Sequence, residues 1–319
     1  MSKRAISAAA PELPLLERRW TPARIGLGAR ARDLGFLVLL GLSIMWSWQP
    51  LTTVIVRSLN SEEYKHYSHI ILLPLVSAYL LYLNRHAILQ RPKPSLRLGV
   101  LLAVTGATTV WLGRTAVTTV DPEYRLSLAM LGLVMLWMGG FVLCYGLRAL
   151  QTGVFPFALL LFMVPLPPVA LTAIVAFLQK TSADGAAVLF AVVGMPFFRD
   201  GFSFSLPGLT ILVAPECSGI RSSLALLISG LVMAYLFLSV TWARVALVLV
   251  IIPLAIVKNA VRIVLLSWLA VHIDPSFVTG SALHEKGGIP LFFVSLTILG
   301  AIAWLLRRHE ELKTRLVGV

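Results

Sequence analysis

The sequence is poor in charged residues, in cysteine and in ligand-binding motifs. Only 13% of its 319 residues are charged, and only two are cysteines, Cys144 and Cys217. A cysteine together with histidines scattered along the sequence does not provide the ligands of a structural zinc site. His284 and the glutamate after it would open a zincin motif, but Gly288 stands where the second histidine is required. No glycine-rich phosphate loop is present either, so we expect no metal and no cofactor.

Long apolar runs fill most of the chain instead. Hydrophobic residues make up 58% of it, in continuous windows near the length of a bilayer span, which predicts membrane-spanning helices. The first run is too long for a cleaved signal peptide and is expected to stay. The predicted fold class is an all-α polytopic membrane protein with about eight transmembrane helices. The expected spans are 34–56, 67–83, 98–112, 126–147, 154–168, 220–240, 245–263 and 289–306.

Residues 171–195 are apolar but are interrupted by Gln179, Lys180 and Asp184. We expect an interfacial or broken helix there, because a charged face favours the interface. A true span at 171–195 would invert the topology of everything after it. With eight spans, the two cysteines are expected near opposite membrane faces, about 30 Å apart, which excludes a disulfide between them.

The positive charge of the chain agrees with this topology. The formal net charge is +13, and the basic residues gather in the parts expected to face the cytoplasm. The excess charge is therefore a topology signal and does not predict a nucleic-acid partner. The expected layout is a basic cytoplasmic tail at 1–33, a transmembrane domain at 34–306 and a basic cytoplasmic tail at 307–319.

A small extracytoplasmic β-hairpin is predicted before the sixth span. Asp200-Gly201 is a type I′ turn signal, and residues 202–206 alternate between apolar and polar. The hairpin would serve either as a lid over helix ends or as an edge strand that pairs with an extended peptide. Both roles stay open.

The polar run at 213–223 opens into an apolar helix and contains the main candidate for chemistry. Pro215 suits the first turn of a helix, which places Cys217 near a helix N-terminus. The unpaired N–H groups and the helix dipole there favour an anion, so the thiolate should form more readily. The alternative is a cysteine that only fills a core, as we expect for Cys144.

Two further residues are candidate partners of the cysteine. Arg262 follows Lys258 by one helical turn near the outer end of the seventh span, and ionisable groups at membrane depth are often functional. The alternative is an arginine that snorkels to the interface. His284 precedes the last span and suits a general base. Taken alone, the position is more typical of a loop histidine than of a base, and His272 competes with it.

Three features in this order resemble the exosortase/archaeosortase family: ECSGIR at 216–221, NAVR at 259–262, and His284 before a closing span. Exosortases are multi-pass membrane enzymes of Gram-negative bacteria that recognise C-terminal sorting tails of the PEP-CTERM kind. The resemblance implies that Cys217 attacks the scissile carbonyl and forms a thioester. It also implies that His284 shuttles the proton and that Arg262 stabilises the oxyanion. Candidate substrate-binding residues are Glu216, Ser218, Arg221 and Asn259.

The implied function is a membrane-embedded cysteine protease or transpeptidase. It would cleave sorting tails of exported proteins on the periplasmic side of the cell inner membrane. The expected partners are these tails and membrane lipid. The alternative is a non-enzymatic transporter or an exopolysaccharide export or assembly protein, since broken helices and intramembrane charges also mark transport paths. Such a protein should tolerate Cys217→Ser far better than a thiol enzyme would.

Overall fold

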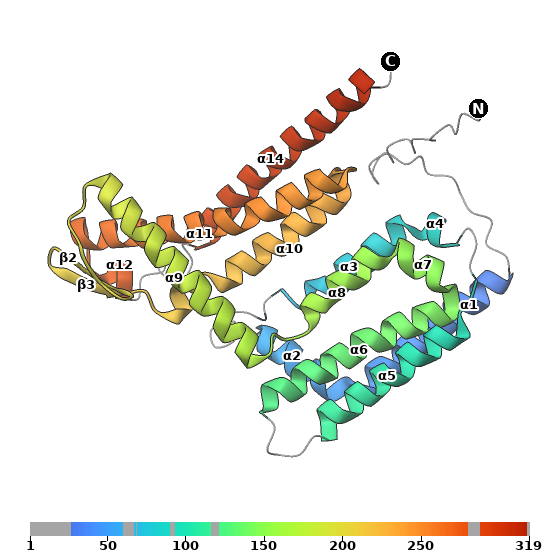
Figure 1. The fold of residues 1–319 in the computed structure, drawn as a ribbon. Helices are drawn as coiled ribbons and strands as arrows, with labels where there is room; N and C mark the ends of the chain where they lie inside the picture. The colour runs from blue at the N-terminus through green and yellow to red at the C-terminus, as the bar shows by residue number, and fades with distance from the viewer. Residues whose placement is uncertain are drawn as a thin grey trace, which may run out of the picture. The chain divides into compact units, whose positions relative to one another are not determined.

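A computed structural model describes residues 27–59, 67, 69–89, 93–115, 121–279 and 288–317. This part of the chain is mainly helical, with one small antiparallel sheet (Figure 1). It forms two compact units, Thr21–Phe177 and Leu178–Val319. The helices and strands are α1 Leu27–Trp46, α2 Trp48–Leu59, α3 Leu72–Leu83, α4 Arg85–Leu89, α5 Leu96–Thr115, α6 Pro122–Tyr145, α7 Leu147–Thr152, α8 Val154–Leu160, η3 Leu161–Met163, α9 Pro168–Val193, β1 Phe198–Asp200, β2 Ser203–Leu206, β3 Leu209–Leu212, η4 Pro215–Ser218, α10 Ile220–Phe237, α11 Thr241–His272, α12 Ser276–Thr279 and α14 Gly288–Val317.

Within the described ranges, six helices are long and apolar enough to cross a membrane: α5, α6, α9, α10, α11 and α14. A seventh candidate is the pair α1 and α2, which is bent by 75°. The expected spans 67–83 and 154–168 correspond to shorter apolar helices, α3 and the joined α8 and η3, and a full span needs about 20 residues. The polytopic helical class is confirmed, whereas the count of eight spans is not.

Of the two alternatives predicted for 171–195, the broken helix is wrong, because α9 runs unbroken for 26 residues. The interfacial helix stays a prediction. Two of the polar residues of α9 have tertiary partners instead. Gln179 donates to the Val213 carbonyl at 2.6 Å, and Asp184 accepts from Arg199 at 2.8 Å. A polar residue satisfied by a neighbouring segment does not interrupt a helix, because its hydrogen-bonding groups need not compete with the backbone. If α9 is a true span, the topology after it inverts relative to the expectation.

In the unit that precedes α9, α1 bends into α2 near Pro50, which lacks an N–H group and crowds the carbonyl four residues earlier. Two hydrogen bonds fasten α1 along α6. Tyr145 donates to Asp33 at 2.6 Å, and Trp137 donates to Ser43 at 2.9 Å. These polar contacts fix the register of the two apolar helices, because a polar side chain within a membrane has few other hydrogen-bond partners.

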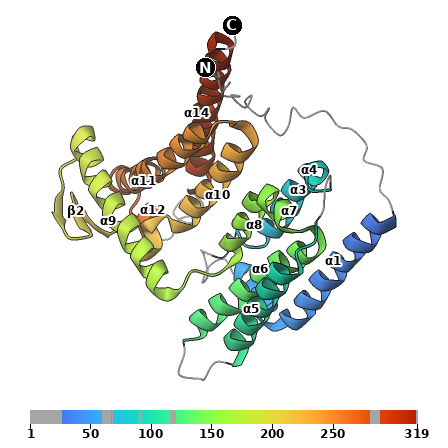
Figure 2. The same ribbon diagram turned by 45° about the vertical axis from the view of Figure 1, so that its right-hand side comes forward.

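Glycines bring α5 and α6 together along their length (Figure 2). A Cβ added at Gly106 would lie 2.7 Å from the Leu136 nitrogen, and one at Gly113 would lie 2.6 Å from the Ala129 nitrogen. From the other side, a Cβ at Gly132 would lie 2.6 Å from the Val110 nitrogen. The two backbones therefore pack directly on each other, as small residues allow in membrane helix pairs.

Gly132→Val is expected to separate α5 from α6 and to lower the melting temperature of the detergent-solubilised protein strongly. The valine side chain would meet backbone atoms, which cannot turn away as a flexible side chain can. Gly41→Val in α1 is the matched control, because nothing lies within 4 Å of a Cβ added there. Equal melting temperatures for the two variants would contradict the close packing.

A buried polar network ties α2 to α6 in the same unit. The Arg57 guanidinium pairs with Glu123, and the Tyr67 hydroxyl donates to the same carboxylate at 2.8 Å. Ser58 donates to the Tyr67 carbonyl at 2.9 Å. Burial of the phenol, together with the neighbouring Glu123 carboxylate, raises the pKa of Tyr67. The phenol therefore stays a neutral hydrogen-bond donor.

In the second unit, a three-stranded sheet in the order β1-β2-β3 replaces the predicted hairpin. The first turn lies between Asp200 and Ser203, as the Asp-Gly signal indicated. A second turn at Pro207-Gly208 adds β3, which pairs with β2 through Leu206 and Leu209. The prediction missed β3, although a Pro-Gly pair before a run with Thr210 and Ile211 is a recognisable turn and strand signal.

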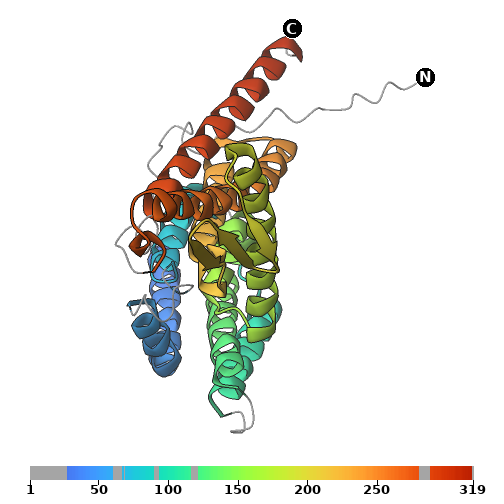
Figure 3. The ribbon, with the colours of Figure 1, turned by 90° about the vertical axis from the view of Figure 1, so that its left-hand side faces the viewer.

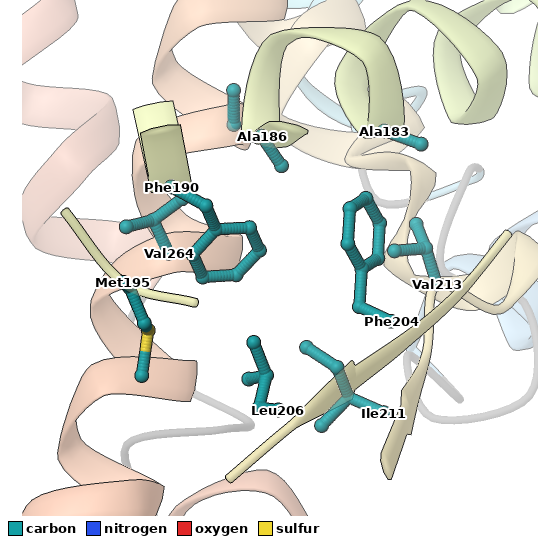
Figure 4. Close-up of a cluster of buried hydrophobic side chains, with 10 residues drawn as sticks. Ala183, Ala186, Phe190, Met195, Phe204, Leu206, Ile211, Val213 and Val264 are labelled. Carbon is teal, nitrogen blue, oxygen red and sulfur yellow. The ribbon is translucent and has the colours of Figure 1, made fainter. Parts of the chain in front are cut away.

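The sheet packs on α9 and α11 through one apolar core (Figures 3 and 4). Phe204 and Ile211 point from the sheet toward Phe190 of α9, and Phe204 lies 5.4 Å from Phe190 between ring centroids. Ala260 and Val264 of α11 close the core on another side. Cys217, the candidate nucleophile, packs against this core.

Helices α10, α11 and α14 pack side by side in the same unit around a second core, which contains Leu226, Ile251 and Leu299. The start of α11 is fixed by Glu310 of α14, whose side chain is 8% exposed. Its carboxylate accepts hydrogen bonds from the backbone N–H groups of Ser239 and Val240, at 3.1 and 3.0 Å. The expected boundary at 306 is not a structural break, since α14 continues to Val317.

Glu310→Ala is expected to destabilise this unit by about 1–3 kcal/mol, because two backbone donors lose a charged acceptor. Thermal unfolding in detergent would measure the change. Glu311→Ala is the matched control: its carboxylate pairs with Arg307 at 2.9 Å but is 52% exposed, and exposed ion pairs contribute little. A Glu311 variant as unstable as the Glu310 variant would refute the assignment.

Candidate thiol site

Cys217 lies in η4, the short 3-10 helix between β3 and α10. Strand β3 leads into this turn through Val213. Val213 is buried, and its carbonyl accepts a hydrogen bond from Gln179 of α9. Within the turn, the Cys217 N–H donates to the Ala214 carbonyl at 2.8 Å. The thiol is free and partly buried. The cysteine is thus carried on a short, hydrogen-bonded turn that is held at its entrance.

The helix expected to begin at Pro215 is interrupted at Gly219. This glycine adopts a left-handed conformation with φ of +72° and separates η4 from α10. A tertiary contact also requires glycine at this position, because a Cβ at Gly219 would lie 2.7 Å from Oδ1 of Asn259. Cys217 therefore precedes the N-terminal turn of α10, whose first N–H groups have no helical partner. Pro215 does occupy the first turn of a helix, as predicted.

Asn259 joins the cysteine turn to α11. Its Nδ2 donates to the Cys217 carbonyl at 2.9 Å, and the residue is 1% exposed. The side chain contacts Gly219 as well, so it holds the turn on both sides of Ser218. A buried amide with a backbone partner is a fixed structural contact.

Lys258 makes a second contact with the same turn through Ser222 of α10. Its Nζ donates to Ser222 Oγ at 2.5 Å. The Ser222 hydroxyl in turn donates to the Gly219 carbonyl at 3.1 Å. Lys258 is only 6% exposed. Two consecutive residues of α11 therefore hold the segment from Cys217 to Gly219.

Arg262 follows Asn259 by three residues on α11 and so lies on the same face of the helix, one turn along. It is partly buried. Cys217 packs against the core formed in part by Ala260 and Val264, on either side of Arg262 in sequence. The structure thus brings the predicted cysteine, asparagine and arginine to one region of α11.

The remaining predicted substrate-binding residues differ in accessibility. Ser218 is fully buried, and its hydroxyl has no hydrogen-bond partner among the described residues. Arg221 is exposed at the start of α10. Glu216 lies in η4, but its side chain is outside what the structure describes. Of these three, Arg221 is the one whose described side chain is open to its surroundings.

The predicted general base His284 lies outside the described residues. Its competitor His272 ends α11, about 20 Å along the helix from Asn259. The ring of His272 stacks on Trp268 at 4.6 Å and contacts the Trp268 carbonyl at 2.9 Å. This separation from the cysteine turn argues against His272 as its base.

No group of three or more histidine, cysteine, aspartate or glutamate residues suited to a metal ion occurs in the part of the chain that the structure describes. The sequence reading missed Gln179 and Ser222, which hold the cysteine turn from α9 and α10. Polar residues inside apolar helices were the available signal, because such residues are expensive in a membrane without a partner.

Comparison with known families supplies the remaining evidence. The family profile described as Transmembrane exosortase (Exosortase_EpsH) matches residues 61–301, which include Cys217, Arg262 and His284. No curated protein and no solved structure was found to be similar to the chain. The match covers most of the sequence and all of the α9 to α11 region that builds the thiol site. The chain therefore belongs to the transmembrane exosortase family.

Proposed function

We propose that the protein is a membrane cysteine protease or transpeptidase. It cleaves the C-terminal sorting tails of exported proteins at the outer face of the cell inner membrane. The observation that carries the proposal is the joining of Cys217 to the Asn259 and Arg262 face of α11, within the region matched by the exosortase family. The expected partners are sorting tails and membrane lipid.

In the proposed reaction, the Cys217 thiolate attacks the carbonyl carbon of the scissile peptide bond. The guanidinium of Arg262 stabilises the oxyanion of the tetrahedral intermediate. The amide nitrogen takes a proton, supplied by His284, and leaves with the tail, so that a thioester to Cys217 remains. Water or an amine then attacks the thioester, restores the thiol and releases the shortened protein.

The buried positions of Ser218 and Asn259 refine the roles we assign around this reaction. Both were candidates for substrate contact, but the carboxamide of Asn259 is already bonded to the Cys217 carbonyl. We assign both residues to the framework of the turn. Arg221, which is exposed, stays the candidate for contact with the tail.

The test compares the C-termini of exported proteins in cells that carry the native chain with those in cells that carry Cys217→Ala. The proposal expects a set of proteins that retain a short hydrophobic, basic-ended tail only in the variant cells. The residues shared before those tails would define the recognised motif. Identical C-termini in both cells would refute the protease function and favour the transport or assembly alternative.

A further inference from the structure

Lys258 is a buried cation that the proposed reaction does not use. Its side chain lies inside the unit with 6% exposure, and its one hydrogen bond in the described structure goes to the neutral hydroxyl of Ser222. An ammonium has three N–H donors, so two of them lack a protein acceptor there. Burying a charge is unfavourable unless a counter-charge or several hydrogen bonds compensate it.

The surroundings of Lys258 increase this cost. Arg262, one turn along α11, has the same charge, and like charges four residues apart on a helix are unfavourable. Among the described residues, no acidic side chain forms a salt bridge with Lys258. An apolar residue of similar length would be less costly at such a position. Lys258 is therefore a buried cation without an acidic partner among the described residues.

The segment that Lys258 holds carries one described group that can become an anion, the Cys217 thiol. Lys258 reaches Ser222, Ser222 reaches the Gly219 carbonyl, and the residue next to Lys258 holds the Cys217 carbonyl. These contacts connect the ammonium to the cysteine turn through one side chain. A buried charge there acts with little screening by salt.

We propose that Lys258 is a positioning residue for Cys217: it holds the cysteine turn through Ser222 and supplies a fixed positive charge that favours the thiolate. This inference rests on the proposed thiol chemistry. Other charged groups on the surrounding described elements are Arg262 on α11, Arg221 on α10, Lys180 and Asp184 on α9, and Glu216 in η4. Asp184 is already paired with Arg199, and Lys180 and Arg221 are exposed.

The test uses the full-length protein in detergent with Cys144→Ala, which leaves Cys217 as the single thiol. Alkylation of Cys217 by iodoacetamide is followed from pH 5 to pH 10, because the thiolate is the reactive form. Lys258→Met removes the charge at nearly constant length. Ser222→Ala keeps the charge and breaks the contact with the turn. Lys258→Arg restores a positive charge.

For Lys258→Met we expect the pH of half-maximal alkylation to rise by about one unit, with an alkylation rate about tenfold lower at pH 7 and unchanged at pH 10. The Ser222→Ala and Lys258→Arg variants should keep a midpoint near that of the parent protein. Lys258→Met should also melt at the same or a higher temperature, because it removes an uncompensated buried charge.

If Lys258 had only a structural role, both the melting temperature and the alkylation profile would differ from these expectations. Lys258→Met would then melt at a lower temperature and would be alkylated with the parent pH profile, and this outcome would overturn the inference. If Lys258→Met does not fold, Lys258→Gln gives the same comparison, because it keeps a donor for Ser222 without charge. Alkylation and melting do not require the tail substrate. Failure of tail cleavage in cells would therefore refute the proposed function independently of the results for Lys258.

Discussion

Replacing Cys217 with alanine is expected to abolish tail cleavage while the protein stays folded in the membrane. Without the thiol no thioester forms, and loss of a covalent nucleophile typically lowers the rate by a factor on the order of 10⁴ or more. The cysteine is partly buried in a turn held by backbone and side-chain hydrogen bonds, so alanine removes little of the packing. Cleavage of a tail-bearing substrate by purified protein in detergent measures the effect.

Cys144→Ala is the matched control, because this thiol lies near the end of α6 in the other compact unit. It is expected to keep full cleavage activity. Cys217→Ser distinguishes a thiol enzyme from a transporter, since serine preserves size but is a much weaker nucleophile at neutral pH. Cleavage that survives either change at Cys217 would remove the thioester mechanism.

Gly219→Ala is expected to reduce cleavage about a hundredfold or more, although the residue carries no reactive group. Alanine is strained at a φ of +72°, and its Cβ would lie 2.7 Å from Asn259 Oδ1. The turn must move away from α11, which carries Cys217 with it. Displacements of about 1 Å in a reacting group can cost about a hundredfold in rate. Cleavage assays together with melting temperatures would separate misplacement from unfolding.

Gly208→Ala controls for backbone strain alone. Gly208 has a φ of +77°, but nothing lies within 4 Å of a Cβ added there. We expect a small loss of stability and near-normal cleavage. The double variant Gly219→Ala with Asn259→Ala tests the collision itself: because the clashing amide is gone, it should cleave no worse than Asn259→Ala alone. A double variant with the summed defects of both changes would show that strain, not contact, explains Gly219.

The helical membrane fold was predictable because apolar runs need no partner in lipid and form helices wherever they are long enough. The runs at 98–112, 245–263 and 289–306 fall within helices that are long and apolar enough to span, and those at 126–147 and 220–240 run only two or three residues past the ends of two more. The count of eight spans is not confirmed, and the doubtful segments are those where helix length and polarity point in opposite directions. Residues 67–83 and 154–168 are apolar but form short helices, whereas α9 is polar in places and still long.

The wrongly predicted break in α9 came from residues whose partners are distant in sequence. Gln179 and Asp184 resemble helix interruptions until Val213 and Arg199 are placed beside them. Periodicity within a segment contains no information about such partners, because the cost of a buried polar group depends on what faces it. The third strand, in contrast, was predictable from local sequence, because a Pro-Gly turn signal precedes it at 207–208.

The order of the cysteine, arginine and histidine motifs was sufficient to indicate the family, because these residue types are costly in a membrane and stand out against apolar neighbours. The order contained nothing about how the cysteine is held. That depends on Asn259 and Lys258 reaching the turn across 36 to 42 residues of chain. Reactive residue types can be read along a chain, but the contacts that orient them arise only when distant segments pack together.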